Sequence, residues 1–157
     1  MTARPKKQVP RYCTAPNLEW AARPDPTPVL IGSRLKPNQI EAILQSYGLR
    51  RIRDADANLQ SMAGDPQQRR QLADILPALL EAIGRTADPD QALNHWERWL
   101  ESGVSRSAVL EYLGSAPRMV DLVCTIFGNS NALAVTLVRD PLLLYWLAQQ
   151  NVLSTAP

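Results

Sequence analysis

The sequence predicts an all-α fold, and three observations point to it. The helix-favouring residues Leu, Ala, Arg, Glu and Gln are frequent, whereas only 7 of the 157 residues are glycine. Val and Ile are scattered, so no run of them is typical of a strand. Asp-Pro pairs recur ahead of stretches in which apolar residues follow helical spacing. Short loops between these stretches predict a multi-helix array of short antiparallel neighbouring helices, preceded by a Pro-rich extended N-terminal arm.

Residues 1–34 are expected to form that arm, basic and poorly ordered. They hold 6 of the 13 prolines and six Lys or Arg against two acidic residues. Proline at this density removes amide donors and stops helix propagation. The favoured interpretation is a solvated tail. An arm that contacts nucleic acid or a membrane is the alternative, weakened because only four basic residues fall within the first 11 positions.

Capping residues place the helices of the second predicted unit, a helical domain of residues 35–157. Three Asp-Pro pairs are expected to start helices: Asp65-Pro66, Asp88-Pro89 and Asp140-Pro141. In each pair the carboxylate can accept the backbone amides of the first turn, and the proline has no amide that needs a partner. Further helix starts are expected at Asn38, Asp54, Ser105, Ser115 and Ser130. Helix ends are expected at Gly48, Gly64, Gly103, Gly114 and Gly128. The predicted helices span 39–47, 55–63, 66–84, 89–102, 106–113, 117–127, 131–138 and 141–150, with a kink or break in the third at Pro77.

Apolar stripes predict where the core lies. One helical stripe comprises Ala92, Leu93, Trp96, Trp99 and Leu100, and a second comprises Met119, Val120, Leu122, Val123, Ile126 and Phe127. The last two helices are apolar almost all round, so residues 104–157 are predicted to form the centre of the core. Because the chain ends soon after them, either earlier helices wrap around this segment or it docks on another domain or a partner.

Composition narrows the function classes. The net charge of +2 is too small to indicate nucleic-acid binding on its own. The longest apolar stretch, 142–147, is too short to span a bilayer, and no N-terminal run resembles a signal peptide. A cytoplasmic chain without nucleic-acid or membrane partners is therefore expected. No disulfide between Cys13 and Cys124 is expected, and one His with two distant Cys cannot supply a metal site.

Few residues are candidates for catalysis. Asp54-Ala55-Asp56 superficially matches paired carboxylates that hold Mg²⁺, but a helix-start role is favoured. Gly114-Ser115 is followed soon only by Asp121, and Gly32-Ser33 lies far from Asp54. His95 lacks a catalytic partner and is interpreted as a surface or boundary residue. A role in anchoring the core is favoured over a stacking platform for Trp96, Trp99, Tyr145 and Trp146. A solvated face is favoured over a phosphate contact for Arg50, Arg51 and Arg53.

Three stretches carry a family resemblance. The first contains Asp65-Pro66, Leu72 and Leu76-Pro77-Ala78-Leu79-Leu80; the second runs from Ala87 to Asn94 and into Glu97-Arg98-Trp99-Leu100. The third holds Phe127-Gly128-Asn129-Ser130, followed by Arg139-Asp140-Pro141 and Trp146-Leu147. In this order they resemble the N-terminal helical region of bifunctional glutamine synthetase adenylyltransferase/adenylyl-removing enzymes, over about residues 45–150.

The resemblance implies a place in the regulation of nitrogen metabolism. Such enzymes use Mg²⁺ and ATP in nucleotidyltransferase domains to attach AMP to a tyrosine of glutamine synthetase, and a second such domain to remove it. The helical region precedes the first catalytic domain. The Gly-Ser turn and paired aspartates of those domains have no counterpart here, so no catalytic, cofactor-binding or metal-ligating residue is carried over.

Two interpretations follow. The first is the N-terminal helical segment of such an enzyme, as a fragment, split subunit or truncated product that is inactive alone and has glutamine synthetase or the missing catalytic domains as partner. The alternative is a free-standing helical interaction module. Leu143 and Trp146 are the candidate interaction surface in either case, and self-association through the apolar C-terminal end is expected if that surface is uncovered.

Overall fold

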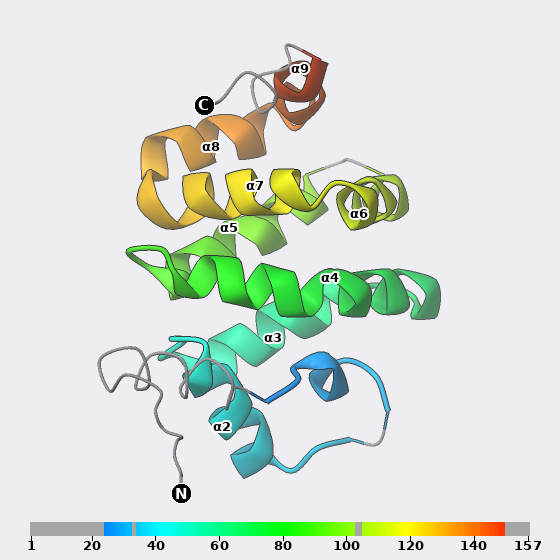
Figure 1. Cartoon of the computed structure of the whole chain (residues 1–157), viewed down its shortest axis with the longest axis vertical. Coiled ribbons are helices and arrows are strands. Elements are labelled where there is room, and N and C mark those ends of the chain that lie inside the picture. The colour runs from blue at the N-terminus through cyan, green and yellow to red at the C-terminus, as the bar shows by residue number, and fades with distance from the viewer. Residues whose placement is uncertain (1–23, 33, 103–104, 150–157) are drawn as a thin grey trace, which may run out of the picture.

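The computed structural model describes residues 24–32, 34–102 and 105–149, and within these ranges it contains α-helices, one short 3-10 turn and no strand (Figure 1). This confirms the all-α prediction. The predictions for residues 1–23, including Cys13 and the four basic residues of the first 11 positions, and those for Ser33 and Gly103 lie outside the described residues. The elements in order are η1 (Thr27–Val29), α2 (Pro37–Ser46), α3 (Ile52–Ala63), α4 (Pro66–Gly84), α5 (Pro89–Glu101), α6 (Arg106–Ser115), α7 (Pro117–Asn129), α8 (Asn131–Arg139) and α9 (Leu143–Gln149).

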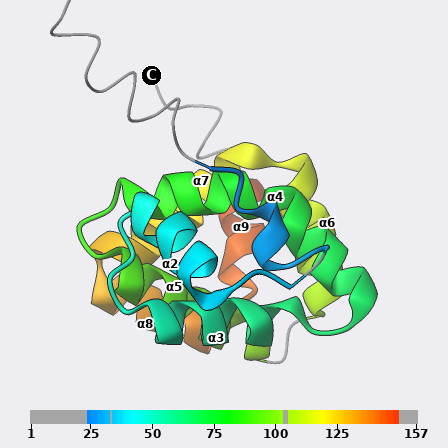
Figure 2. The same cartoon turned by 90° about the horizontal axis from the view of Figure 1, so that it is seen from below.

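The helices form a two-layered stack that rises in chain order from α2 at one end to α9 at the other (Figure 1). Seen along the stack, α3, α5 and α8 lie in one layer and α4 and α7 in the other (Figure 2). Contacts follow the same order: α3 packs on α5 and α5 on α8, while α7 bridges the layers by touching α4, α5 and α8. The most extensive packing therefore joins helices two or three places apart in the chain, including α4 with α6 and α7, whereas the successive helices α5 and α6 scarcely touch.

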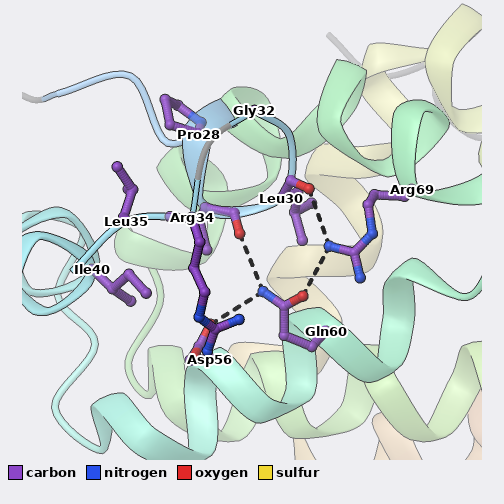
Figure 3. Close-up of a pocket in the computed structure, with 10 residues that line it drawn as sticks. Pro28, Leu30, Gly32, Arg34, Leu35, Ile40, Asp56, Gln60 and Arg69 are labelled. Carbon is purple, nitrogen blue, oxygen red and sulfur yellow. Dashed lines mark hydrogen bonds between the residues drawn. The ribbon is translucent and has the colours of Figure 1, made fainter. Parts of the chain in front are cut away.

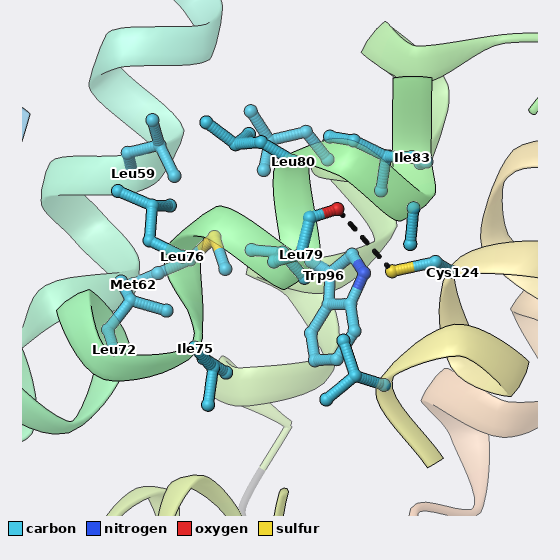
Figure 4. Packing of buried hydrophobic residues seen from close by; sticks show 14 of the residues in the cluster. Leu59, Met62, Leu72, Ile75, Leu76, Leu79, Leu80, Ile83, Trp96 and Cys124 are labelled. Atoms are coloured by element: carbon cyan, nitrogen blue, oxygen red, sulfur yellow. Dashed lines mark hydrogen bonds between the residues drawn. The ribbon is translucent and has the colours of Figure 1, made fainter. Parts of the chain in front are cut away.

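The core is centred on α4, α5 and α7 (Figure 4). Its fully buried large side chains include Leu72, Leu76, Leu79, Leu80, Ile83, Trp96, Trp99 and Phe127. The prediction that residues 104–157 form the centre therefore holds for α7, which lies in that range, but is wrong for α8 and α9. Helices α8 and α9 lie at the end of the stack that the structure describes, and they and the turn between them leave large apolar side chains exposed: Leu133 at 58%, Val135 at 37%, Leu142 at 67% and Trp146 at 53%.

Several predicted helix starts are confirmed by hydrogen bonds. Asp65 accepts the amide of Gln68, Asp88 accepts that of Gln91, and Ser130 accepts that of Leu133. Ser105 occupies the N-cap position of α6 without a side-chain bond. Helix α9 begins two residues after the Asp140-Pro141 pair.

Three other predicted starts are wrong. Asn38 and Asp54 lie inside the first turns of α2 and α3, and Ser115 is the last residue of α6. In α2 and α7 a proline stands at the first position instead, where its fixed φ suits a helix and its missing amide costs nothing. The proline, rather than the neighbouring polar residue, marks these two starts.

Glycines end only some of the helices. Gly48 and Gly64 follow α2 and α3 with positive φ angles of 90° and 64°. Gly114 and Gly128 lie within α6 and α7, so their prediction as helix ends is wrong. Helix α4 also runs unbroken through Pro77, which faces solvent.

The Pro-rich segment is not extended throughout. Residues 27–29 form η1, and the side chains of Val29 and Leu30 are buried. Two polar side chains hold the segment against α3 and α4 (Figure 3). Gln60 donates to the Val29 carbonyl at 3.1 Å, and Arg69 donates to the Leu30 carbonyl at 3.1 Å and to Gln60 Oε1 at 2.8 Å. These bonds satisfy carbonyls that no helix ladder serves.

Candidate functional site

Two loops far apart in sequence are joined at the middle of the stack, and they carry two of the stretches on which the resemblance rests. The loop before α5 donates through the Ala87 amide to Asn129 Oδ1 at 2.8 Å. The Asp88 amide donates to the Gly128 carbonyl at 3.1 Å. Gln91 adds a longer bond to the Phe127 carbonyl at 3.4 Å. We call this contact between residues 86–91 and 127–131 the α5–α7 junction.

Asp90 extends the junction to a third element. Its side chain is 9% exposed, and its carboxylate accepts the backbone amides of Arg50 at 3.2 Å and Arg51 at 3.3 Å. A buried carboxylate is costly unless such donors satisfy it. The pair of donors precedes α3, so Asp90 fixes where that helix begins. Sequence reasoning missed this role, although an acid two residues after a capping aspartate was a visible signal.

Gly128 allows α7 to approach the junction closely. A Cβ atom at this position would overlap the side chain of Thr86. Glycine is therefore required at position 128 because α7 approaches the loop at Thr86 closely, and not because the backbone there has a positive φ angle. The same residue offers its carbonyl to Asp88, so the approach and the hydrogen bond depend on each other.

An aromatic cluster lies directly beneath the junction. Trp96, Trp99 and Phe127 have ring centroids 5.4 to 5.9 Å apart in edge-to-face arrangements. Such pairs add stabilisation beyond the area they bury. The expectation that Trp96 and Trp99 anchor the core is confirmed, since both are fully buried.

His95 is also buried, at 4% exposure, so its interpretation as a surface or boundary residue is wrong. Helix α8 covers it, and Nε2 lies 3.2 Å from Asn131 Oδ1. Burial lowers the pKa of His95; the Asn131 bond opposes this, and the charge of Arg98 lowers the pKa further. The ring is thus held neutral near pH 7.

Cys124 gives a chemical probe of this core. It is fully buried on α7, and its Sγ lies 3.8 Å from the Leu79 carbonyl (Figure 4). Burial raises the pKa of the Cys124 thiol to about 12. The thiolate, which is the reactive form, is therefore negligible in the folded protein at neutral pH.

We expect Cys124 to resist thiol reagents until the protein unfolds. In a Cys13→Ser variant it is the single remaining cysteine. Ellman's reagent at pH 8 should leave the folded variant unmodified and should modify one thiol per chain in denaturant. Rapid stoichiometric reaction without denaturant would show that α7 does not cover this thiol in solution.

The carboxylates considered for catalysis do not converge. Asp54 is exposed in the first turn of α3, whereas Asp56 accepts a bond from Gln60 at 3.3 Å. Asp121 pairs with Arg85 at 2.9 Å on the surface. Within the described ranges no group of three or more His, Cys, Asp or Glu residues is arranged to hold a metal ion. The side chains of Arg50, Arg51 and Arg53 are exposed, as both a solvated face and a phosphate contact require.

The candidate interaction surface divides between two faces of α9. Leu143 is partly buried and packs against the core, while Trp146 is 53% exposed. Leu142, which the sequence did not single out, lies just before α9 and is 67% exposed; its carbonyl accepts the amide of Trp146, four residues later, at 3.3 Å, so it continues the turn of the helix. Residues at this spacing share one side of a helix. Tyr145 is partly buried and contacts Tyr112 at a centroid distance of 5.7 Å, whereas the exposed Trp146 departs from the core-anchoring expectation.

Comparison with known proteins finds relatives of the family that the sequence resembles. The chain is similar to bifunctional glutamine synthetase adenylyltransferase/adenylyl-removing enzymes. That of Mesorhizobium japonicum is 27% identical over 136 residues, which are 82% of this chain and 14% of the relative. That of Nitrosococcus oceani is 31% identical over 74% of this chain and 13% of the relative. That of Streptomyces coelicolor is 42% identical over 40% of this chain.

The similarity has clear bounds. The chain spans about one seventh of the length of the relatives that it matches most extensively. No family model matches it, and no solved structure matches it significantly. In the part of the chain that the structure describes, no helix combines the length and apolarity that crossing a membrane demands.

Proposed function

We propose that this chain is a helical scaffold of the kind that precedes the first catalytic domain of a glutamine synthetase adenylyltransferase/adenylyl-removing enzyme. The similarity over 74% and 82% of the chain to two such enzymes is the observation that carries the proposal. The scaffold's task would be to hold a rigid stack against the catalytic domains or against glutamine synthetase, and so to serve the regulation of nitrogen metabolism.

The junction supports a structural role for the resembling stretches. Polar groups of residues 86–91 form hydrogen bonds with polar groups of residues 127–131. The Asp90 carboxylate accepts backbone amides just before α3. Groups engaged in this way are not free to act on a substrate. They instead fix the relative positions of α3, α5, α7 and α8, which is what a scaffold requires.

Mg²⁺ and ATP would belong to the catalytic domains of the longer relatives. A triphosphate bound through Mg²⁺ needs carboxylates that converge on one point. Three of the aspartates do not provide one: Asp90 serves backbone amides, Asp121 pairs with Arg85, and Asp54 is exposed to solvent. No step of nucleotidyl transfer is therefore assigned to these residues.

We expect the purified chain to transfer no label from α-labelled ATP to glutamine synthetase in the presence of Mg²⁺. The same assay tests the scaffold role if the chain is added to a Mesorhizobium japonicum enzyme that lacks the aligned segment. Restored adenylylation in that mixture would support the proposal. Label transferred by the chain alone, and retained after repurification, would contradict it.

A free-standing interaction module is the second candidate function. The exposed side chains of Leu142 and Trp146 on one side of α9 favour it, because contiguous apolar surface commonly marks an interface. The two functions differ in genetic context. A downstream Gly-Ser turn followed by an Asp-x-Asp strand, in the same or the next reading frame, supports the scaffold; its absence together with a failed restoration supports the module.

A further inference from the structure

A pocket of about 280 Å³ lies between α5 and α8, beside the buried face of His95. Helix α5 contributes His95 and Arg98, and helix α8 contributes Val135, Val138 and Arg139. The pocket is separate from the exposed side of α9 that carries Leu142 and Trp146. Its walls combine two features that a docking site needs: an apolar lining and unpaired charge.

The apolar lining comes from the valines. Val135 is 37% exposed although it faces the pocket, so its side chain remains available for contact. Val138 is partly buried against the core and cannot easily move away. Beneath them, the Nδ1 atom of His95 is buried without a hydrogen-bond partner among the described residues. The two valines thus form an apolar surface between two packed helices, and such a surface favours an apolar side chain as its occupant.

The charge comes from the arginines. Arg98 and Arg139 are exposed, and the structure gives neither of them an ion pair or hydrogen bond from its side chain to another described residue. On α5, Glu97 and Glu101 both accept the Ser61 hydroxyl on α3, and Glu97 interacts with Arg98 electrostatically without forming an ion pair with it. Asp140 follows Arg139 in sequence but does not line the pocket. The rim is therefore positively charged on both helices.

We propose that this pocket docks an acidic and apolar segment of a partner protein. An apolar side chain would lie between Val135 and Val138, and flanking carboxylates would bind Arg98 and Arg139. Guanidinium groups form strong, paired hydrogen bonds with carboxylates, and opposite charges speed the encounter of two proteins. The occupant's chemistry is thus set by complementarity to both features of the pocket.

Two other occupants fit less well. A second copy of this chain related by two-fold symmetry would bring the same arginines face to face, which is repulsive. A nucleic acid would use the arginines through its phosphates but would leave the valine lining without a partner. Of these three occupants, a polypeptide that carries both acids and apolar side chains is the one that satisfies the free guanidinium groups and the apolar lining together.

The test uses the full chain and a fluorescein-labelled helical peptide in which a leucine pair is flanked by glutamates. A matched peptide carries lysines in place of the glutamates. Fluorescence anisotropy should show at least about ten-fold tighter binding of the glutamate peptide, and an Ala pair in place of the leucines should weaken it. The glutamate preference should fall with added salt, because the charges lie at the surface.

Charge reversal locates the binding. The double variant Arg98→Glu with Arg139→Glu should reverse the preference, so that the lysine peptide binds more tightly. Arg53→Glu is the control, since Arg53 is exposed on α3 and does not line the pocket, and it should change the preference little. Circular dichroism melting of each variant checks that the fold is retained.

Three results would overturn the proposal. The first is no binding of the glutamate peptide by the folded chain. The second is an equal effect of Arg53→Glu and the double variant, which would indicate general electrostatic attraction. The third is concentration-dependent dimerisation that the double variant alters and that competes with the peptide, which would make a second copy the occupant.

Discussion

Replacing Trp96 by alanine should destabilise the protein by about 3 to 5 kcal/mol, the range for losing a large aromatic side chain from a packed core. Trp96 is fully buried, and its ring contacts both Trp99 and Phe127 in edge-to-face geometry. Its removal takes away apolar burial and both ring contacts, and it leaves a cavity that three packed helices cannot readily close. Urea denaturation followed by far-ultraviolet circular dichroism measures the change.

Trp146→Ala is the matched control. Trp146 is 53% exposed on α9, so the same chemical deletion should change the free energy of unfolding by less than about 0.5 kcal/mol. Similar large losses in both variants would mean that α9 is covered in solution and that the stack does not end as described. A small loss for Trp96→Ala would place the aromatic cluster outside the cooperative core.

Local sequence signals predicted the helices because their starts depend on neighbouring residues. The Asp-Pro pairs placed α4 and α5 at Pro66 and Pro89, where the structure begins them. A capping carboxylate and a first-turn proline act within one turn, so no distant contact is needed to interpret them. The short 3-10 turn at 27–29 was missed because its stability comes from Gln60 and Arg69, which lie far along the chain.

The site was less predictable, because its features are defined by contacts between distant segments. Periodicity showed that α8 and α9 have apolar faces, but it does not reveal which faces a neighbour covers. It also placed His95 beside the tryptophan stripe without revealing that α8 packs over it. The pocket rim likewise joins Arg98 to Arg139, two residues that no local pattern relates.

Gly128→Ala should destabilise the protein by about 1 to 3 kcal/mol, the usual cost of forcing atoms into a packed site. Helix propensity alone predicts the opposite sign, because alanine stabilises a helix interior by about 1 kcal/mol relative to glycine. Close approach decides the outcome: the new methyl would overlap Thr86, and relieving the overlap would pull Gly128 away from the Asp88 amide. Thermal and urea unfolding of the variant measure the change.

Two comparisons make this prediction specific to the junction. Gly114→Ala in α6 should be neutral or stabilising by up to about 1 kcal/mol, because its added methyl would meet only the Ile75 side chain at an ordinary 3.9 Å. Thr86→Gly, which removes the overlapping side chain, should reduce the cost of Gly128→Ala when the two changes are combined. A double-mutant cycle measures that coupling, which should exceed about 0.5 kcal/mol for groups in direct contact. Purely additive effects, or stabilisation by Gly128→Ala alone, would show that α7 does not approach residue 86 as closely as the junction requires.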